Sequence, residues 1–220
     1  MTQLENELNE LKVEVGNMWA LVTSQLNKAR DAILHFDKDL AREVMQREKR
    51  VNAYELKIDR DCENIFALYC PVAIDLRFLL AALKVNNNLE RIGDIADGIA
   101  RYVIDAPAPF PKPLMDATQL LKMFQDSINV MNDAKNAFET EDTVLARTIF
   151  EKDEVLDRFN LSANKIIAEV IKQDINLTAE AMYVLSIIRK LERVGDQCTN
   201  IAEEIIFYIE AKVLKHLPQK

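Results

Sequence analysis

Two acidic motifs of the same form stand 102 residues apart in this chain. The first is "LERIGD", with Glu90 and Asp94, and the second is "LERVGD", with Glu192 and Asp196. Each motif places two carboxylates four positions apart, so that on a helix they share one face. Clustered carboxylates with almost no histidine or thiolate nearby suit hard cations such as Mg²⁺, Ca²⁺, Mn²⁺ or oxygen-ligated iron. The chemistry that the motifs predict is therefore cation binding.

A glycine lies inside each motif, directly before the aspartate. The chain has only four glycines, and a glycine within a helix costs roughly 1 kcal/mol relative to alanine. Gly93 and Gly195 therefore indicate a close approach, either by another helix backbone or by bound ions and water.

The acidic residues continue a helical face that begins as core. In the first motif this face runs, in steps of three or four, through Leu79, Leu83, Asn86, Glu90, Asp94, Asp97 and Arg101. In the second it runs through Ala181, Leu185, Ile188, Glu192, Asp196, Thr199 and Glu203. Carboxylates on such a face should be partly desolvated, which is costly unless cations or hydrogen-bond donors compensate.

The helix before each motif supplies a second polar pair with the same spacing. Glu48 and Asn52 are four residues apart, and so are Asp153 and Asp157 in the second half of the chain. Each pair is as far from the predicted turn as the motif that follows it. In an antiparallel hairpin the pairs therefore lie level, about 30 Å from the turn. Whether they also face each other around the helix axes stays open.

The chain repeats itself. A shift of 105 aligns residues 26–45 with 131–150, and four prolines in seven residues separate the two copies. Each copy contains three amphipathic segments with short breaks between them. We therefore predict an all-α protein of six helices in two tandem, pseudo-symmetric three-helix bundles. The repeats are residues 1–105 and 115–220, and residues 106–114 form a Pro-rich linker.

Composition narrows the class of function. The net charge of −8 argues against binding nucleic acid, which selects basic surfaces. We see no signal peptide and no run long enough for direct membrane insertion, so a cytoplasmic protein is expected, with any membrane association through a partner. Three separated cysteines without a CxxC pair indicate neither a disulfide framework nor a zinc site.

Two alternatives to a non-catalytic cation-binding protein stay open. The arginine after each motif glutamate could form salt bridges, which would make the protein a metal-free helical interaction module. Alternatively, clustered carboxylates could hold a metal pair that activates water in a hydrolase or redox enzyme. We find no histidine base, nucleophile motif or Gly-rich phosphate cradle, so we expect no enzymatic activity.

The same residues carry a resemblance to a known family. The double motif, the stretch "PVAIDLRFLLAALKVNNNLERIGDIAD" and the closing "VGDQCTNIAEEIIFYIEAKVL" resemble PhoU proteins, over nearly the whole chain. PhoU proteins are accessory and regulatory proteins of bacterial phosphate-specific transport, built from two three-helix bundles.

The resemblance implies a set of metal ligands, because PhoU proteins hold multinuclear clusters with motifs of the form E(D)xxxD. Mg, Mn or Fe cations are expected, and the candidate ligands are Glu48, Asn52, Glu90, Asp94, Asp97, Asp153, Asp157, Glu192, Asp196 and Asn200. Asn52 stands where the family has an aspartate, and Gly98 where an asparagine often follows the motif. These departures favour the second repeat as the stronger site.

The resemblance also implies a function. A PhoU protein is a non-catalytic cytoplasmic regulator, often a homodimer. It bridges the phosphate ABC transporter, at its ATPase subunit, and the sensor histidine kinase, and it represses the phosphate-starvation response. A relative serving a different phosphate permease is the neighbouring possibility.

Overall fold

The chain folds into long helices with short connections. The structure, a computed structural model, describes residues 2–214, so the outermost ends of the two predicted repeats lie outside the described residues. The α-helices are α1 (Gln3–His35), α2 (Lys38–Tyr69), α3 (Ala73–Asp105), α4 (Lys112–Thr118), α5 (Leu120–Thr140), α6 (Thr143–Gln173) and α7 (Thr178–Glu210). A single 3₁₀ turn, Ile175–Leu177, connects α6 to α7.

The all-α prediction is confirmed, but the count of six helices is wrong: residues 2–214 contain seven α-helices. The additional helix is α4, which begins at Lys112, inside the predicted linker. Pro111 and Pro113 do not prevent it, because a proline fits the start of a helix, where its missing N–H has no partner to lose. The left-handed backbone of Gln119, with φ of 53°, then separates α4 from α5.

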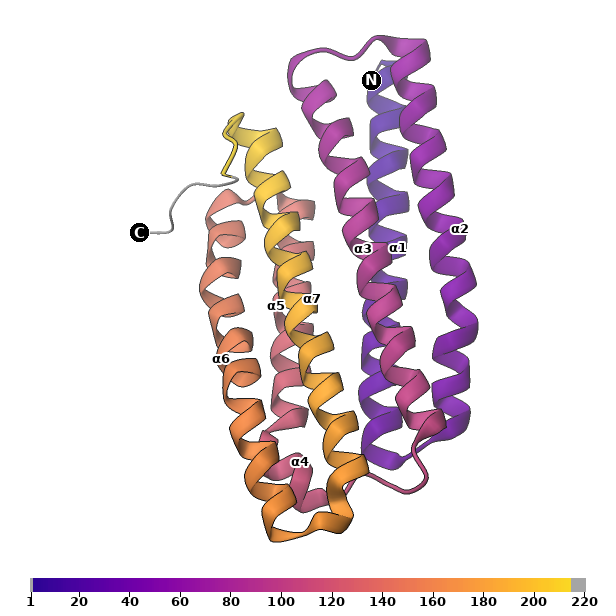
Figure 1. The fold of residues 1–220 in the computed structure, drawn as a ribbon. Coiled ribbons are helices and arrows are strands. Elements are labelled where there is room, and N and C mark those ends of the chain that lie inside the picture. The colour runs from indigo at the N-terminus through magenta and orange to yellow at the C-terminus, as the bar shows by residue number, and fades with distance from the viewer. Residues whose placement is uncertain (1, 215–220) are drawn as a thin grey trace.

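The helices form two bundles that lie side by side (Figure 1). Helices α1, α2 and α3 make one bundle and α4–α7 the other, and α3 packs against α7 along the main contact between them. These two helices run in opposite directions, so the α2–α3 turn and the α6–α7 turn lie at opposite ends of the molecule (Figure 1). The two repeats are therefore related by an approximate twofold axis across the α3–α7 contact.

Each long helix buries one apolar face and exposes a polar one. In α2, Val44, Val51, Ile58 and Ile65 recur every seven residues and are all buried, as the heptad spacing predicts. The indole of Trp19, which is fully buried, donates from Nε1 to the Met131 carbonyl oxygen at 3.2 Å and so ties α1 to α5. Between residues 2 and 214, none of the helices combines the length and the apolar character needed to span a bilayer.

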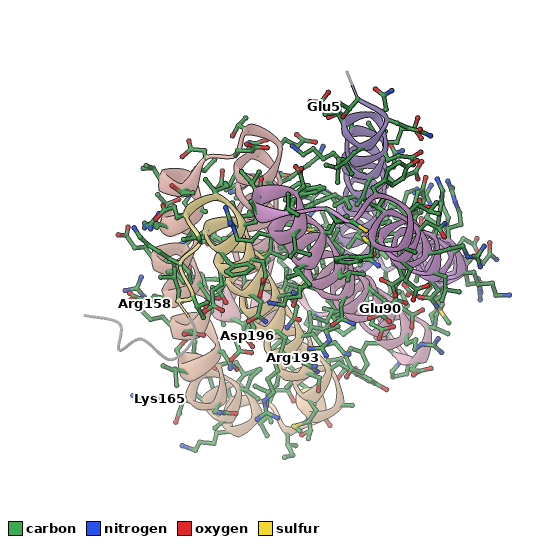
Figure 2. The ribbon with its side chains drawn as sticks, turned by 90° about the horizontal axis from the view of Figure 1, so that it is seen from above. Glu5, Glu90, Arg158, Lys165, Arg193 and Asp196 are labelled. Carbon is green, nitrogen blue, oxygen red and sulfur yellow. The ribbon has the colours of Figure 1, made fainter. Side chains whose placement is uncertain are left out.

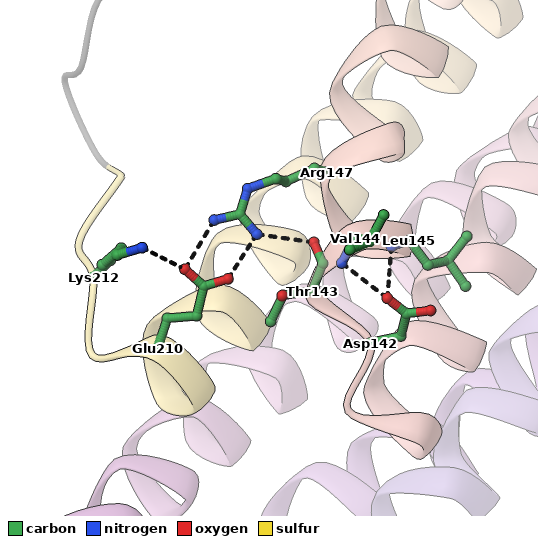
Figure 3. Close-up of polar contacts among 7 residues, drawn as sticks. All are labelled: Asp142, Thr143, Val144, Leu145, Arg147, Glu210 and Lys212. Carbon is green, nitrogen blue, oxygen red and sulfur yellow. Dashed lines mark hydrogen bonds and ion pairs between the residues drawn. The ribbon is translucent and has the colours of Figure 1, made fainter.

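Aspartates at matching positions begin the second helix of each repeat. Asp37 accepts hydrogen bonds from the backbone of the first turn of α2, and Asp142, 105 residues later, does the same for α6 at 2.8 and 2.9 Å (Figure 3). Near the same end of the second bundle, Arg147 donates to both carboxylate oxygens of Glu210, at 2.8 and 3.0 Å, and Lys212 donates to one of them (Figure 3). This bidentate pair joins the start of α6 to the end of α7.

The Arg147–Glu210 pair makes stability sensitive to acid. Hydrogen bonds from Arg147 and then Lys212 lower the pKa of Glu210 from 4.5 to about 2. A carboxylate whose pKa is depressed by folding stabilises the native state above its unfolded pKa and loses that effect as pH falls toward the folded pKa. We expect Glu210→Gln to lower the melting temperature by roughly 1–3 °C at pH 7, a modest change because the pair is at the surface.

The pH series provides the check on this prediction. The difference in melting temperature between the variant and the original protein should shrink between pH 4.5 and pH 2, when calorimetry is run at both ends of that interval. An equal difference at pH 7 and pH 2 would show that the glutamine acts through packing and not through charge.

Candidate metal centre

The glycine of the first motif makes room for a carboxylate from α2. A Cβ atom added at Gly93 would lie 3.2 Å from Glu48 Oε2 and 3.1 Å from Val51 Cγ1. Glu48 therefore lies directly over the backbone of α3 at the motif, one residue before Asp94. The predicted level placement of Glu48 with the first motif is confirmed. The close approach predicted from the mid-helix glycine is also present, but it is made by this carboxylate side chain, where the sequence predicted a helix backbone or bound ions and water.

The second repeat shows the same arrangement with less space. A Cβ atom added at Gly195 would collide with Asp153 Oδ1 and lie 2.8 Å from Leu156 Cδ1. Asp153 stands 105 residues after Glu48, and its carboxylate lies closer to the α7 backbone than that of Glu48 lies to the α3 backbone. In both repeats the glycine is thus required by a carboxylate that rests on the helix backbone.

The carboxyl group of Glu48 is held in a place that opposes its ionisation. Burial, and then the negative charges of Asp94, Asp97 and Glu90, raise its pKa from 4.5 to about 7, against one hydrogen bond that favours the charged form. That bond comes from Gln25 Nε2 to Oε2 at 3.3 Å. The other oxygen, Oε1, is buried and has no hydrogen-bond partner among the described residues.

Asp153 is in the same situation in the second repeat. Burial, and then the negative charges of Asp157, Asp196 and Glu192, raise its pKa from 3.8 to about 7. Its Oδ1 atom, the one lying against Gly195, is buried without a hydrogen-bond partner in residues 2–214. Burial and the neighbouring carboxylates also raise the pKa values of Glu192 and Asp196.

The remaining predicted ligands differ in exposure. Glu90, Asp157 and Glu192 are half-buried, while Asn52, Asp94 and Asp196 are exposed. Figure 2 labels Glu90 in the first bundle and Asp196, beside Arg193, in the second. The exposed members leave each cluster accessible from solvent, and Glu48 or Asp153, each with one buried carboxylate oxygen, lies beneath them.

Asp97 and Asn200 have partners outside the acidic pairs. Asp97 is 8% exposed; its Oδ2 accepts from Arg101 Nε at 2.6 Å, while its Oδ1 is buried and has no partner among the described residues. Asn200 Nδ2 donates to Asn88 Oδ1 at 3.5 Å across the contact between α3 and α7. Asp97 thus has an internal counter-ion, and Asn200 contacts the other repeat.

The twofold relation explains why glycine occupies position 98. Residues 88 and 98 correspond to 190 and 200, so the Asn88–Asn200 hydrogen bond has a counterpart in which Lys190 meets Gly98. A Cβ atom there would lie 2.9 Å from Lys190 Cε, and the ammonium group is closer still. Burial lowers the pKa of Lys190, while Asp94 and Asp97 favour its charged form. The second repeat thus places one of its cations, Lys190, beside the first cluster.

Two acidic residues of α2 were not among the predicted ligands. Glu55 and Asp59 continue the face of Glu48 and Asn52 in steps of three and four, a spacing that the sequence already contains. Burial raises the pKa of Glu55, and the charges of Asp59 and Asp94 raise it further. The first cluster therefore extends one turn beyond the predicted pair.

The donor atoms fit hard cations. Both clusters consist of carboxylate and amide oxygens, and each has a buried carboxylate oxygen that no donor satisfies. In their present rotamers, no three or more acidic, histidine or cysteine side chains within residues 2–214 form a group that could hold a metal ion. Oxygen ligands of this kind would neutralise the charge of a bound cation. Glu48 and Asp153 would lie at the base of their clusters.

The fold and the clusters define a class of protein: a duplicated three-helix bundle with one carboxylate cluster in each copy. The model of the PhoU domain matches this chain twice, over residues 15–103 and 120–205. The chain belongs to the PhoU family.

Similar proteins agree over nearly the full length. A "Phosphate-specific transport system accessory protein PhoU" of Edwardsiella tarda is 32% identical over 98% of this chain and 88% of its own. A "PhoU homolog 1" with the same description, from Thermotoga maritima, is 34% identical over 96% of this chain and 90% of its own. The crystal structure of the "phosphate transport system regulatory protein PhoU" from Streptococcus pneumoniae superposes with a TM-score of 0.87, at 27% identity, covering 97% of this chain and all of that one.

The unequal space at the two glycines predicts unequal effects of alanine. Alanine favours a helix interior by roughly 1 kcal/mol over glycine, but at Gly195 its methyl group would displace Asp153 and press on Leu156. We expect Gly195→Ala to lower the free energy of unfolding by about 1–3 kcal/mol, the range of overpacked cores. Gly93→Ala, with gaps above 3 Å, should change it by less.

Urea unfolding of the two variants in chelator provides the comparison, because chelator removes any contribution from bound cations. The ordering is the prediction: Gly195→Ala is the less stable variant. A Gly195→Ala protein as stable as the original would mean that Asp153 moves away from α7 without cost.

Proposed function

We propose that this protein is a cation-binding, non-catalytic regulator of phosphate transport and of phosphate-starvation signalling, located in the cytoplasm. It bridges the phosphate ABC transporter, at its ATPase subunit, and the sensor histidine kinase, and it acts as a negative regulator of phosphate uptake. In this proposal it works as a homodimer. Membership of the PhoU family supports the link to phosphate, since relatives are named accessory or regulatory proteins of phosphate transport.

The observation that carries the cation-binding part is the position of Asp153. Its carboxylate is pressed against the backbone of α7 at Gly195, and one oxygen is buried without a donor. Three more carboxylates, those of Asp157, Asp196 and Glu192, act on it electrostatically. A group of four negative charges in partly desolvated surroundings is unfavourable, and a divalent cation is the simplest compensation.

Cation binding would act on the rigidity of the molecule. Neutralising the second cluster draws the carboxylates of α6 and α7 together and fixes the two helices at one level, and the first cluster does the same for α2 and α3. The long outer faces of the bundles then form a fixed surface for the kinase and the ATPase subunit. Phosphate status is read by these partners in this proposal, and the protein transmits it through contact and not through turnover.

Removing charge from the second motif tests the cation site. In Glu192→Gln with Asp196→Asn, two negative charges are lost while the side-chain shapes are kept. We expect bound Mn²⁺ in chelator-treated, reloaded protein to fall by about half. The increase in melting temperature caused by Mn²⁺ should also shrink, because a cation at 100 times its Kd stabilises each site by about 2.7 kcal/mol.

A matched control variant changes the net charge by the same amount as the test variant. Glu151→Gln with Glu169→Gln removes two exposed carboxylates from α6, outside the cluster. This variant should retain the Mn²⁺ content of the original protein. If Mn²⁺ neither binds to nor stabilises the original protein, the acidic residues serve salt bridges alone, and the protein is a metal-free helical module.

Partner binding is measured separately from cation binding. The ATPase subunit of the phosphate transporter and the cytoplasmic part of the sensor kinase, from the same organism, are each passed over immobilised protein with Mn²⁺ or with chelator. We expect capture of both, and weaker capture in chelator. Capture of neither partner in either condition would contradict the bridging role and leave the cation site unaffected.

A further inference from the structure

The second helices of the two repeats, α2 and α6, have polar residues at matching positions. At two of these positions an acid and an amide are exchanged between the helices. At a shift of 105, Asn52 of α2 corresponds to Asp157 of α6, and Glu55 corresponds to Asn160. The acid thus comes first in α6 and the amide first in α2. Each helix presents two acids and one amide over two turns, counting Glu48 and its counterpart.

The second repeat shows how far a side chain at the later position reaches. Asn160 Nδ2 donates to Glu192 Oε1 at 3.1 Å, so this position of α6 faces the glutamate of the motif on α7. Glu55 occupies the corresponding position of α2, with a side chain longer by one methylene group. By the repeat symmetry it faces Glu90, the glutamate of the first motif.

The packing of α2 on α3 holds Glu55 in this position. Asn86, one helical turn before Glu90, donates from Nδ2 to the backbone oxygen of Glu55 at 3.0 Å and to Asp59 Oδ1 at 2.9 Å. The Asn86 side chain is fully buried, and its Oδ1 has no hydrogen-bond partner in the described part of the chain. An unsatisfied amide oxygen beside carboxylates is a ligand type that hard cations accept.

The charges agree with this placement. Burial raises the pKa of Glu90, and the negative charges of Asp94 and then of Glu55 raise it further. Asn52, by contrast, is exposed and makes no hydrogen bond recorded for the described residues. Four carboxylates therefore gather at the first cluster, as at the second, although one of them comes from a different turn of the helix.

We propose that Glu55 is a cation ligand of the first cluster and takes the role that Asn52 leaves open. The first site then consists of Glu48, Glu55, Glu90 and Asp94, and one of its four ligands, Glu55, lies about one helical turn nearer the hairpin turn than its counterpart Asp157 does in the second site. Its ligand is a hard divalent cation bound through oxygen alone. This inference rests on the proposed cation-binding function and assigns it a residue outside the candidate ligands that the sequence predicted.

The test isolates the first site. In a background of Glu192→Gln with Asp196→Asn, the Mn²⁺ affinity of chelator-treated protein is measured by electron paramagnetic resonance, with circular dichroism to confirm folding. We expect Glu55→Gln to weaken the remaining Mn²⁺ binding by about tenfold or more, as losing a charged ligand does. Glu63→Gln, an exposed carboxylate on the same helix, should leave it within about twofold.

A restoring substitution separates a ligand from a general charge effect. Adding Asn52→Asp to Glu55→Gln moves the acid to the position it has in α6, and most of the Mn²⁺ affinity should return. The reciprocal pair in the second repeat, Asp157→Asn with Asn160→Glu, should retain Mn²⁺ in a protein whose first motif is neutralised.

The outcomes are distinct. Mn²⁺ binding in the background protein that is lost with Glu48→Gln but not with Glu55→Gln overturns the role of Glu55 alone. Mn²⁺ binding to the original protein only at the second motif overturns the first site as a whole. Failure of the original protein to bind Mn²⁺ at all overturns both this inference and the proposed cation binding.

Discussion

One contact determines the arrangement of the rest: a carboxylate from one helix lies against the backbone of its antiparallel neighbour. Glu48 does this over Gly93 and Asp153 over Gly195. Any side chain at either glycine would meet the carboxylate, so the glycines allow the helices to come close. Because the same contact buries the carboxyl groups among other acids, it raises both pKa values to about 7. The contact that packs the helices closely therefore also creates the need for a counter-charge.

The two copies share a backbone but distribute charge differently. Lys190 extends from α7 over Gly98 of α3, whereas the symmetry-related contact is a hydrogen bond between Asn88 and Asn200. Arg101 neutralises Asp97, and the corresponding positions of the second repeat hold threonine and glutamate. The first cluster thus receives cations from the chain itself, while the second has none in the equivalent places. Under the proposed cation binding, we therefore expect the two clusters to differ in their affinity for cations.

The helices could be predicted closely because their signals are local. Periodic apolar residues fixed the buried faces, and Asp37 and Asp142 cap helices at the breaks that the sequence indicated. The exceptions have local causes as well. Prolines obscured α4 although they suit a helix start, and the left-handed backbone of Ala211, with φ of 56°, ends α7 at Glu210. The candidate site was predicted at its level along the hairpins, but Glu55 was missed because its role depends on the facing helix.

The sequence by itself determined the duplication, the helical class, the two acidic motifs and the height at which their partner carboxylates lie, since all of these follow from spacing along the chain. Only the tertiary structure decided which side chains meet across helices. The rotation of each helix about its axis is set by packing between distant segments, and it places Glu48 and Asp153 over glycines and Lys190 beside the other repeat. Spacing gives distance along a helix, whereas direction around it comes from what the helix packs against.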